Sequence, residues 1–156
     1  MPQDWLFRTE EGTCDFRCAA VIIRNGKVLL QRDGNEYAMI GGHVQVGETG
    51  EQAVVREFEE ELGVKIRCQR MIWVEESFWT WKGKQNHTLS FYYLAEPSDG
   101  DGLPADGQFL PQRDNPRVEI GWVLMDELHD LTVYPAFIKQ EIGQLSPGIR
   151  HFVSRE

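Results

Sequence analysis

The sequence is poor in cysteine and in long apolar runs. It contains three cysteines, Cys14, Cys18 and Cys68, among 156 residues. An odd count at these spacings indicates reduced thiols and not a disulfide framework. No run of about 18 apolar residues is present, so the sequence predicts no membrane-spanning helix and no membrane partner. The first residues lack a basic stretch followed by an apolar one, and we therefore expect a cytoplasmic protein.

Basic residues are outnumbered by acidic ones, and the formal net charge is −9. Because duplex nucleic acid is bound by basic surfaces, this balance argues against duplex nucleic acid as a partner. A small phosphorylated ligand remains compatible with it, since divalent cations can lie between an acidic site and a polyphosphate. The length and the apolar content of 41% fit a single globular domain over residues 1–156.

Turn and strand signals alternate irregularly along the chain. Asn25-Gly26, a strong hairpin signal, separates apolar runs at 19–23 and 28–30, which predict strands covered on both faces. Helices are expected at about 50–62 and at 134–145. Further strands are expected at 37–40, 43–46, 64–75, 88–95 and 119–124, with a hairpin or mobile loop at 77–87. This order predicts an α/β fold with helices on the faces of a mixed sheet.

A long loop is expected at residues 96–117, which hold four of the seven prolines. Too little chain follows this segment to form a second domain, so it is interpreted as a loop within one domain. Loops of this length without secondary structure are uncommon and often functional.

The segment REFEEELGV at residues 56–64 crowds four glutamates near the end of the first expected helix. Negative charges there are unfavourable, because they repel one another and the helix dipole. At about 100° per residue, Glu57, Glu60 and Glu61 share one face beside the apolar stripe of the helix. Glu59 falls almost opposite Glu57, where solvent is expected.

Three converging carboxylates have two interpretations. An acidic face exposed to solvent is common and needs no ligand. Alternatively, the repulsion is relieved by raised pKa values or by a bound cation, and oxygen ligands select hard cations such as Mg²⁺ or Mn²⁺. The upstream residues favour the second interpretation. Gly41-Gly42 permits close approach of the backbone, and Thr49 with Gln52 predicts a capping box at the start of the helix.

The spacing of these residues forms a longer pattern. From Gly42 the chain reads glycine, five residues, Glu48, seven residues, Arg56-Glu57, an apolar residue, any residue, Glu60-Glu61, any residue, Gly63 and an apolar residue. This segment, residues 42–64, resembles the complete signature of the Nudix (MutT-like) hydrolases. The earlier VLLQR and the later EIGWVLMDEL are also similar to the family pattern, so the resemblance covers roughly residues 17–130.

The chain departs from the family pattern at two positions. Ile40 stands where members usually have proline, and Gln45 stands where many have an acidic residue. Neither position is a metal ligand in the usual scheme of the family, although Gln45 would weaken a contact made by an acidic residue there.

The resemblance implies a fold, a reaction and a cofactor. The fold would be a mixed β-sheet sandwiched between α-helices, and the reaction would be hydrolysis of a pyrophosphate bond in a nucleoside diphosphate linked to another group. The cofactor would be Mg²⁺ or Mn²⁺, and by motif position its ligands would be Glu57, Glu60, Glu61 and the carbonyl of Gly41. Arg56 would orient Glu57 or pair with Glu48, and Glu57 or Glu60 would be the general base.

Substrate-binding residues lie outside most of the signature. We expect contributions from Arg32, His43, Trp81 and Glu119, of which Glu119 is also a candidate metal ligand or base. Several other residues are candidates for base stacking or phosphate contact, although each also fits a structural role: Trp73, Phe78, Trp79, Tyr92, Arg24, Lys82 and Lys84.

Subtype markers of the family narrow the substrate. The NADH-type run Ser-Gln-Pro-Trp-Pro-Phe-Pro is absent, and so is the proline typical of ADP-ribose enzymes about fifteen residues past the signature. A nucleoside triphosphate or a nucleoside diphosphate sugar is therefore the expected small-molecule substrate. Dimerisation is common for this fold, which makes a homodimer the expected assembly.

Two alternatives share the same fold. One is a non-catalytic nucleotide-binding or regulatory module, which would be marked by degenerate glutamates; here all three are present. The other is a prenyl diphosphate isomerase, which would need a catalytic cysteine, and Cys68 lies outside any matching context.

Overall fold

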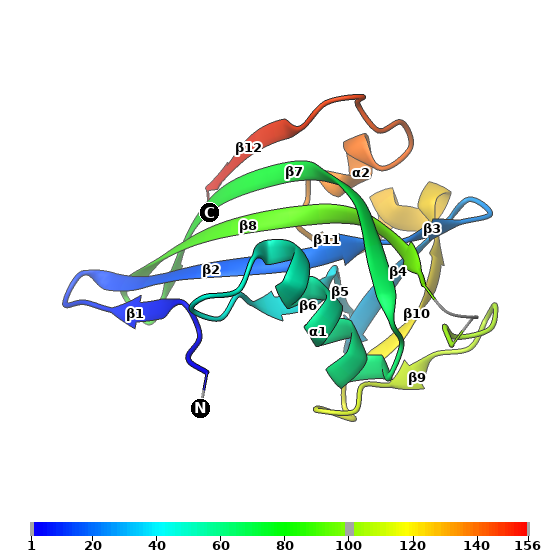
Figure 1. Cartoon of the computed structure of the whole chain (residues 1–156). Coiled ribbons are helices and arrows are strands. Elements are labelled where there is room, and N and C mark those ends of the chain that lie inside the picture. Colours follow the sequence, from blue (N-terminus) through cyan, green and yellow to red (C-terminus); the bar gives the residue numbers. More distant parts are fainter. Residues whose placement is uncertain (1, 99–101, 156) are drawn as a thin grey trace.

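The computed structural model describes residues 2–98 and 102–155, and the strands in these residues form two mixed six-stranded sheets (Figure 1). The first sheet contains β1 (Leu6–Arg8), β2 (Gly12–Val21), β6 (Ile40–His43), β7 (Ile66–Trp81), β8 (Lys84–Pro97) and β12 (Arg150–Arg155). The second contains β3 (Ile23–Arg24), β4 (Lys27–Asp33), β5 (Glu36–Ala38), β9 (Leu110–Pro111), β10 (Glu119–Leu124) and β11 (Thr132–Tyr134). The helices are α1 (Gly50–Leu62), the 3-10 helix η1 (Met125–Asp130) and the short α2 (Ile138–Glu141).

The order of the first sheet is β1-β2-β8-β7-β12, with β6 paired to β2, and that of the second is β11-β5-β4-β10-β9, with β3 paired to β4. The pairs β2–β8, β7–β12 and β5–β11 are parallel and the other pairs are antiparallel. The mixed character that was predicted is therefore confirmed.

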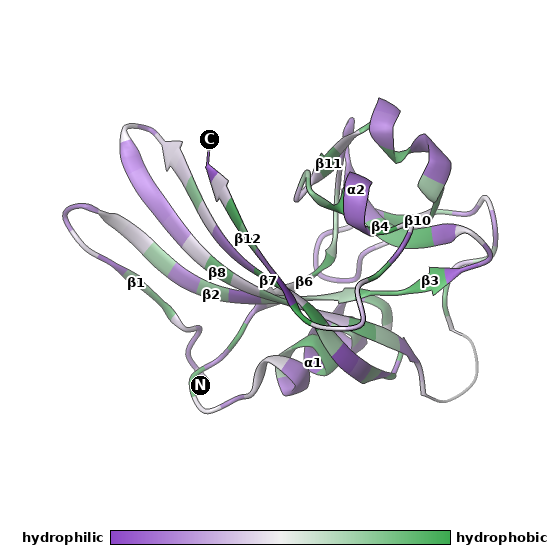
Figure 2. Cartoon of the chain, turned by 90° about the horizontal axis from the view of Figure 1, so that it is seen from above, coloured by the Kyte–Doolittle hydropathy of each residue, from purple (hydrophilic) through white to green (hydrophobic). Residues whose placement is uncertain are grey.

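Two apolar clusters cover the opposite faces of the strands, as the continuous hydrophobic runs predicted. Along β2, Cys18 and Ala20 belong to the cluster beneath α1, whereas Ala19 and Val21 belong to the cluster that includes residues of η1 and α2. Helix α1 accordingly lies on one side of the strands, and α2 lies on the other (Figure 2). This arrangement leaves each long strand buried on both faces near its middle.

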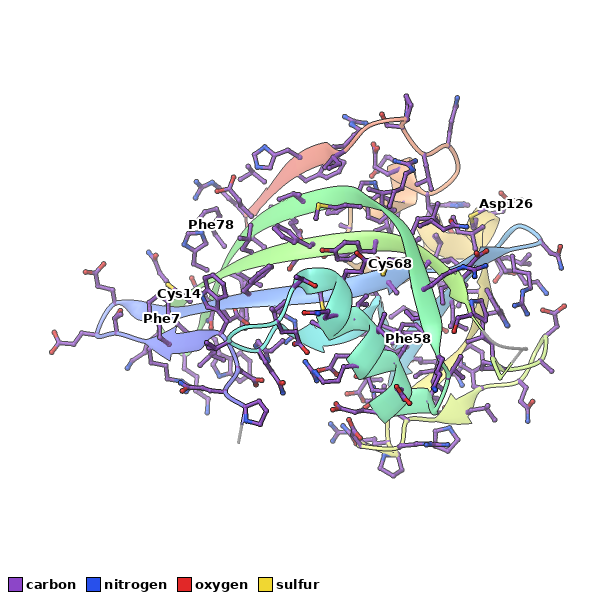
Figure 3. All side chains as sticks on the ribbon, in the orientation of Figure 1. Phe7, Cys14, Phe58, Cys68, Phe78 and Asp126 are labelled. Atoms are coloured by element: carbon purple, nitrogen blue, oxygen red, sulfur yellow. The ribbon has the colours of Figure 1, made fainter. Side chains whose placement is uncertain are left out.

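Helix α1 begins and ends where the sequence predicts. The Thr49 hydroxyl accepts the Gln52 backbone N–H at 3.0 Å, and the Gln52 side chain accepts the Thr49 N–H at 2.9 Å, which completes the capping box. Gly63 ends the helix in the left-handed region, with φ of 71°, and its N–H donates to the Glu59 carbonyl. Phe58, labelled in Figure 3, is fully buried against the sheet.

Several expected strands are confirmed, and the hairpin at Asn25-Gly26 joins β3 to β4. Strand β10 has the predicted bounds. The segment 77–87 is a hairpin, because β7 and β8 pair as far as Trp81 and Lys84 around Lys82-Gly83. Part of the predicted loop at 96–117, residues 99–101, lies outside the described residues, and β9 interrupts the remainder.

Two predictions of local structure are wrong. The paired glycines do not separate two strands: β6 runs through them, because residues 40–43 pair antiparallel with β2. The closing helix at 134–145 is also wrong, since Tyr134 pairs in parallel with Ala38 and is therefore extended. Only residues 138–141 form α2. The terminal strands β1 and β12 were not predicted.

The described part of the chain contains no helix with the length and hydropathy that crossing a membrane requires.

Replacement of Gly41 by alanine tests the close contact between β6 and β2. A Cβ atom at Gly41 would collide with the Cys18 carbonyl and lie 2.7 Å from the Ala19 Cα. Backbone atoms cannot move aside as flexible side chains do, so Gly41→Ala should lower the free energy of unfolding by about 2 kcal/mol or more in urea titrations. Gly143→Ala is the control, because a Cβ atom there meets open space, and it should change stability by less than about 0.5 kcal/mol. Equal stability of the two variants would contradict the packing described.

Candidate active site

The acidic face of α1 is turned partly into the protein. Glu61 is 5% exposed and the Glu57 side chain 14%, whereas the Glu60 side chain is 48% exposed. The Glu57 carboxylate lies directly against Gly42, where any Cβ atom would collide with it. The second glycine of the pair is thus the residue that leaves room for a carboxylate beside β6. Of the three predicted ligands, the structure brings Glu57 and Glu61 together and leaves Glu60 at the rim.

Arg56 links the helix to the loop that precedes it. Its Nε and Nη2 donate to the two carboxylate oxygens of Glu48 at 2.8 and 2.9 Å, and Nη2 also donates to the His43 carbonyl at 3.0 Å. Its Nη1 donates to Glu57 at 3.0 Å and to Glu60 at 3.3 Å. The sequence left open whether Arg56 pairs with Glu48 or orients Glu57, and the structure contains both contacts.

The Glu48 carboxylate also holds the loop between β6 and α1 in place. The Glu48 carboxylate accepts the Gln45 backbone N–H at 2.9 Å in addition to its bonds from Arg56. The hydrogen bond from Arg56 holds the pKa of Glu48 below its ordinary value, and the pKa of Arg56 is raised in turn, chiefly by its bond to Glu48. Glu48 is therefore an anion that fixes the loop and the guanidinium, which in turn restricts Glu57.

Glu57 and Glu61 lie close enough to share a proton. Burial raises the pKa of Glu57, and it raises the pKa of Glu61 to about 8, with further contributions from the charges of Glu57 and Asp114. A hydrogen bond between the two carboxyl groups favours the protonated form of Glu61 and the ionised form of Glu57. Burial and the neighbouring carboxylates thus favour the protonated form of Glu61.

The donor set fits a hard cation. One oxygen of Glu61, Oε2, is buried without any hydrogen-bond partner, which is costly unless something else binds it. Carboxylate oxygens are the ligands that Mg²⁺ and Mn²⁺ prefer. Within residues 2–98 and 102–155, however, no three side chains of aspartate, glutamate, histidine or cysteine are already arranged as a metal-binding group. The exposed Glu60 instead contacts Arg56 at 3.3 Å.

A loop residue near this site was missed by the sequence analysis. The Arg113 backbone N–H donates to the Glu61 carbonyl at 2.9 Å, and the Arg113 guanidinium lies against Gly63. This contact brings the next residue, Asp114, near enough for its charge to raise the pKa of Glu61. The proline-rich composition of 96–117 indicated a functional loop, but nothing in the sequence distinguished Asp114 from the other acidic residues there.

A cleft of about 660 Å³ is lined by residues from strands of both sheets. Cys18 and Gly41 line it beside β6, and the Cys18 thiol donates to the carbonyl of Gly42, the residue that faces Glu57. The cleft therefore adjoins the acidic face of α1 through one strand. Its wall includes residues of β7, β8, β12 and the segment after β11, among them Phe78, Trp79, Tyr92 and Tyr134. Phe78 lies near the free end of β12 (Figure 3).

Of the predicted substrate-binding residues, Arg32, His43, Trp81 and Glu119 do not line the cleft, whereas the candidates for base stacking Phe78, Trp79 and Tyr92 do. Arg32 pairs with Glu119 at 3.0 Å, and its guanidinium lies 3.8 Å from the centre of the Phe109 ring. Trp81 is 62% exposed at the tip of the β7–β8 hairpin. His43 contacts Asp15 at 2.8 Å.

The sequence analysis also missed a positively charged side chain that lines the cleft. Arg17 lines the cleft, and its Nη1 lies 3.5 Å from the His43 ring. Pairing of Arg17 with His43 across β2 and β6 brings both residues to the same level of the sheet. Arginine at this position carries no local sequence signal, because its place in the cleft depends on strand pairing.

The chain is similar in sequence to a known domain family and to characterised hydrolases. The sequence model of the NUDIX domain matches residues 16–142. The NAD-capped RNA hydrolase NudC of Pectobacterium carotovorum is 35% identical over 119 residues, which are 73% of this chain and 40% of that protein. The ADP-ribose pyrophosphatase of Methanocaldococcus jannaschii is 30% identical over 86 residues, 52% of this chain and 50% of that protein. The chain thus spans two fifths to one half of the length of these relatives.

A solved structure agrees in fold. The MutT NUDIX hydrolase from Burkholderia pseudomallei superimposes with a TM-score of 0.56 at 27% identity, over 72% of this chain and 84% of that one. Together with the match over residues 16–142, this similarity extends from β2 to the segment that follows α2. The chain belongs to the Nudix hydrolase family.

Proposed function

We propose that this protein is a metal-dependent pyrophosphohydrolase that cleaves a nucleoside diphosphate linked to another group. The observation that carries the proposal is the buried Glu57–Glu61 pair, whose unpartnered Glu61 oxygen lies one strand away from a cleft of nucleotide size. Relatives named as a hydrolase of NAD-capped RNA and as an ADP-ribose pyrophosphatase support the same class of reaction.

The positions of the residues in the signature, together with their contacts, support the following roles. Glu57, Glu60 and Glu61, with the Gly41 carbonyl as a further ligand, would hold Mg²⁺ or Mn²⁺. When bound, such a cation neutralises phosphate oxygens and lowers the pKa of water. Arg56 positions Glu57 and anchors the preceding loop through Glu48.

Glu57 is the stronger candidate for general base. Its raised pKa makes it a better proton acceptor than an ordinary glutamate, while its bond from Arg56 fixes one oxygen. Glu60, which is half exposed, remains the alternative.

The substrate we favour is a nucleoside triphosphate or a nucleoside diphosphate sugar. The aromatic rings in the cleft suit a nucleobase, since stacking on an aromatic side chain is worth about 1–3 kcal/mol per base. The NudC relatives raise NAD-like substrates as a second candidate, but the chain lacks the Ser-Gln-Pro-Trp-Pro-Phe-Pro run typical of NADH enzymes.

A substrate panel tests the proposal directly. The purified protein would be incubated with nucleoside triphosphates, nucleotide sugars, ADP-ribose and NADH, with Mg²⁺, with Mn²⁺ or with EDTA, and the products would be separated by chromatography. Cleavage of a pyrophosphate bond only when metal is present is the expected result. Metal and nucleotide binding without cleavage of any member would instead favour a non-catalytic nucleotide-binding module.

Neutral replacements of the glutamates should separate catalysis from folding. Glu57→Gln and Glu61→Gln should each lower turnover by roughly two orders of magnitude or more, because each removes a charge that faces the cation and its phosphates. Glu60→Gln should also lower it, to a degree that shows whether the exposed residue takes part. Glu59→Gln is the matched control on the solvent side of α1 and should keep normal activity. Unchanged turnover in both buried variants would refute the site.

Binding of metal should depend on pH without any substrate. Because the folded pKa of Glu61 is raised to about 8 from the ordinary 4.5, the folded state holds an extra proton between these values. The free energy of unfolding of the metal-free protein should therefore fall as pH rises through this window. Mn²⁺ must displace that proton, so the increase in Tm that it causes should be larger at pH 8.5 than at pH 6.

The variant Glu61→Gln isolates this effect. It should flatten the pH dependence of stability and reduce the increase in Tm caused by Mn²⁺, whereas Glu59→Gln should behave as the wild type. A Mn²⁺ effect that is independent of pH would show that Glu61 is not protonated before the cation binds.

A further inference from the structure

The floor of the cleft contains a buried carboxylate that the proposed reaction does not use. Glu75 lies on β7, lines the cleft and is 5% exposed. The Tyr92 hydroxyl donates to its Oε1 at 2.7 Å, and the Ser154 hydroxyl donates to its Oε2 at 2.6 Å. Both oxygens therefore act as acceptors, and three different strands hold the group in place.

Glu75 is held by neutral donors and not by a cation. In residues 2–98 and 102–155 the structure gives it no ion pair, whereas the neighbouring Glu76, on the opposite face of β7, contacts His151 at 2.7 Å. Burial and the charge of Glu75 raise the pKa of Tyr92, so that the phenol remains a donor. Each oxygen of a carboxylate can accept a second hydrogen bond, so Glu75 has acceptor capacity beyond its two bonds. This arrangement is suited to a ligand that brings donors.

The surroundings of Glu75 suit a flat ring. Ser77 and Ser90 are small residues that line the same cleft, so the floor beside the carboxylate is open. Trp79 and Tyr134 also line the cleft, and they keep 37% and 44% of their surface exposed. An acceptor beside exposed aromatic rings is the combination by which proteins bind a nucleobase, through stacking and contacts to its edge.

The acceptor-only character of a carboxylate discriminates among the bases. Guanine presents two adjacent donors, N1–H and the N2 amino group, which a carboxylate can accept together. Adenine and cytosine place an acceptor nitrogen beside their amino group, and uracil places its N–H between two carbonyl oxygens. An acceptor facing Glu75 would be repelled and left unpaired, and buried polar sites reject such mismatches strongly.

We infer that Glu75, positioned by Tyr92 and Ser154, makes the cleft selective for a guanine base. The inference rests on the proposed function in that it names the base of the same substrate. Ser154 belongs to β12, so one of the two residues that position Glu75 lies beyond the matched residues 16–142.

The test is binding of nucleoside monophosphates, which requires no hydrolysis. GMP, AMP, CMP and UMP would be titrated without metal into the wild type and into Glu75→Gln, with isothermal calorimetry and intrinsic tryptophan fluorescence as readouts. The wild type should bind GMP about tenfold or more tightly than the others. Glu75→Gln should weaken GMP binding by about tenfold and change AMP binding little. Glu76→Gln, one residue away on the opposite face, should leave all four affinities unchanged.

Positioning by Ser154 has its own readout. Ser154→Ala should weaken GMP binding less than Glu75→Gln does, and Ser154→Thr, which keeps the hydroxyl, should restore it. Urea unfolding of each variant monitors a purely structural role. Equal binding of the four nucleotides by the wild type, or an equal loss of all four in Glu75→Gln, would overturn the inference. Hydrolysis without a preference for guanine would also overturn the guanine selectivity, but it would support the proposed reaction. Selective GMP binding without hydrolysis of any substrate would support the guanine selectivity and refute the proposed reaction.

Discussion

The site depends on keeping two carboxylates together inside the protein at the end of a helix. Glu57 and Glu61 occupy a position where burial, mutual repulsion and the helix dipole all oppose negative charge. Two features of the protein make this tolerable. Arg56 neutralises part of the charge through its bond to Glu57, and the raised pKa of Glu61 favours its protonated form. The residual strain is visible in the unpartnered Glu61 oxygen, which a cation would relieve.

The backbone around the helix is built to permit this arrangement. Gly42 leaves space for the Glu57 carboxylate, and Gly41 allows β6 to approach β2 more closely than a side chain would permit. The Arg56–Glu48 pair fixes the loop between β6 and α1, while the Arg113 N–H ties the later loop to the C-terminal end of α1. Residues from three separate segments thereby converge on one short stretch of helix.

The sequence predicted best what depends on neighbouring residues. The capping box at Thr49, the end of the helix at Gly63 and the shared face of Glu57 and Glu61 follow from local chemistry and helical periodicity. The helix expected at 134–145 failed because pairing of Tyr134 with β5, a long-range contact, overrode the local signal. Asp114 was missed for a related reason, since a loop contact brings it to Glu61.

The residues of the cleft also depend on long-range contacts, which local sequence patterns do not reveal. Arg17, Glu75 and Ser154 come from β2, β7 and β12, and they meet only because these strands occupy particular places in the sheet. The predicted Trp81, although aromatic and close in sequence, lies at a hairpin tip outside the cleft. Pattern reasoning identifies the helix because its residues are contiguous, but it cannot identify a surface assembled from strands that are distant in sequence.

This difference suggests how the two parts of the site can change independently. The proposed reaction would depend on one face of α1 with the strand and loops that touch it, whereas the cleft lies on the other side of β6. Within residues 2–98 and 102–155, the strands β6 and β2 contribute to both, through Gly41, Gly42 and Cys18. A substitution at Glu75 or Ser154, which line the cleft, can therefore alter its polarity while Glu57 and Glu61 keep their contacts. Family signature and substrate preference are for this reason separate properties of the chain, and only the first is encoded in residues 42–64.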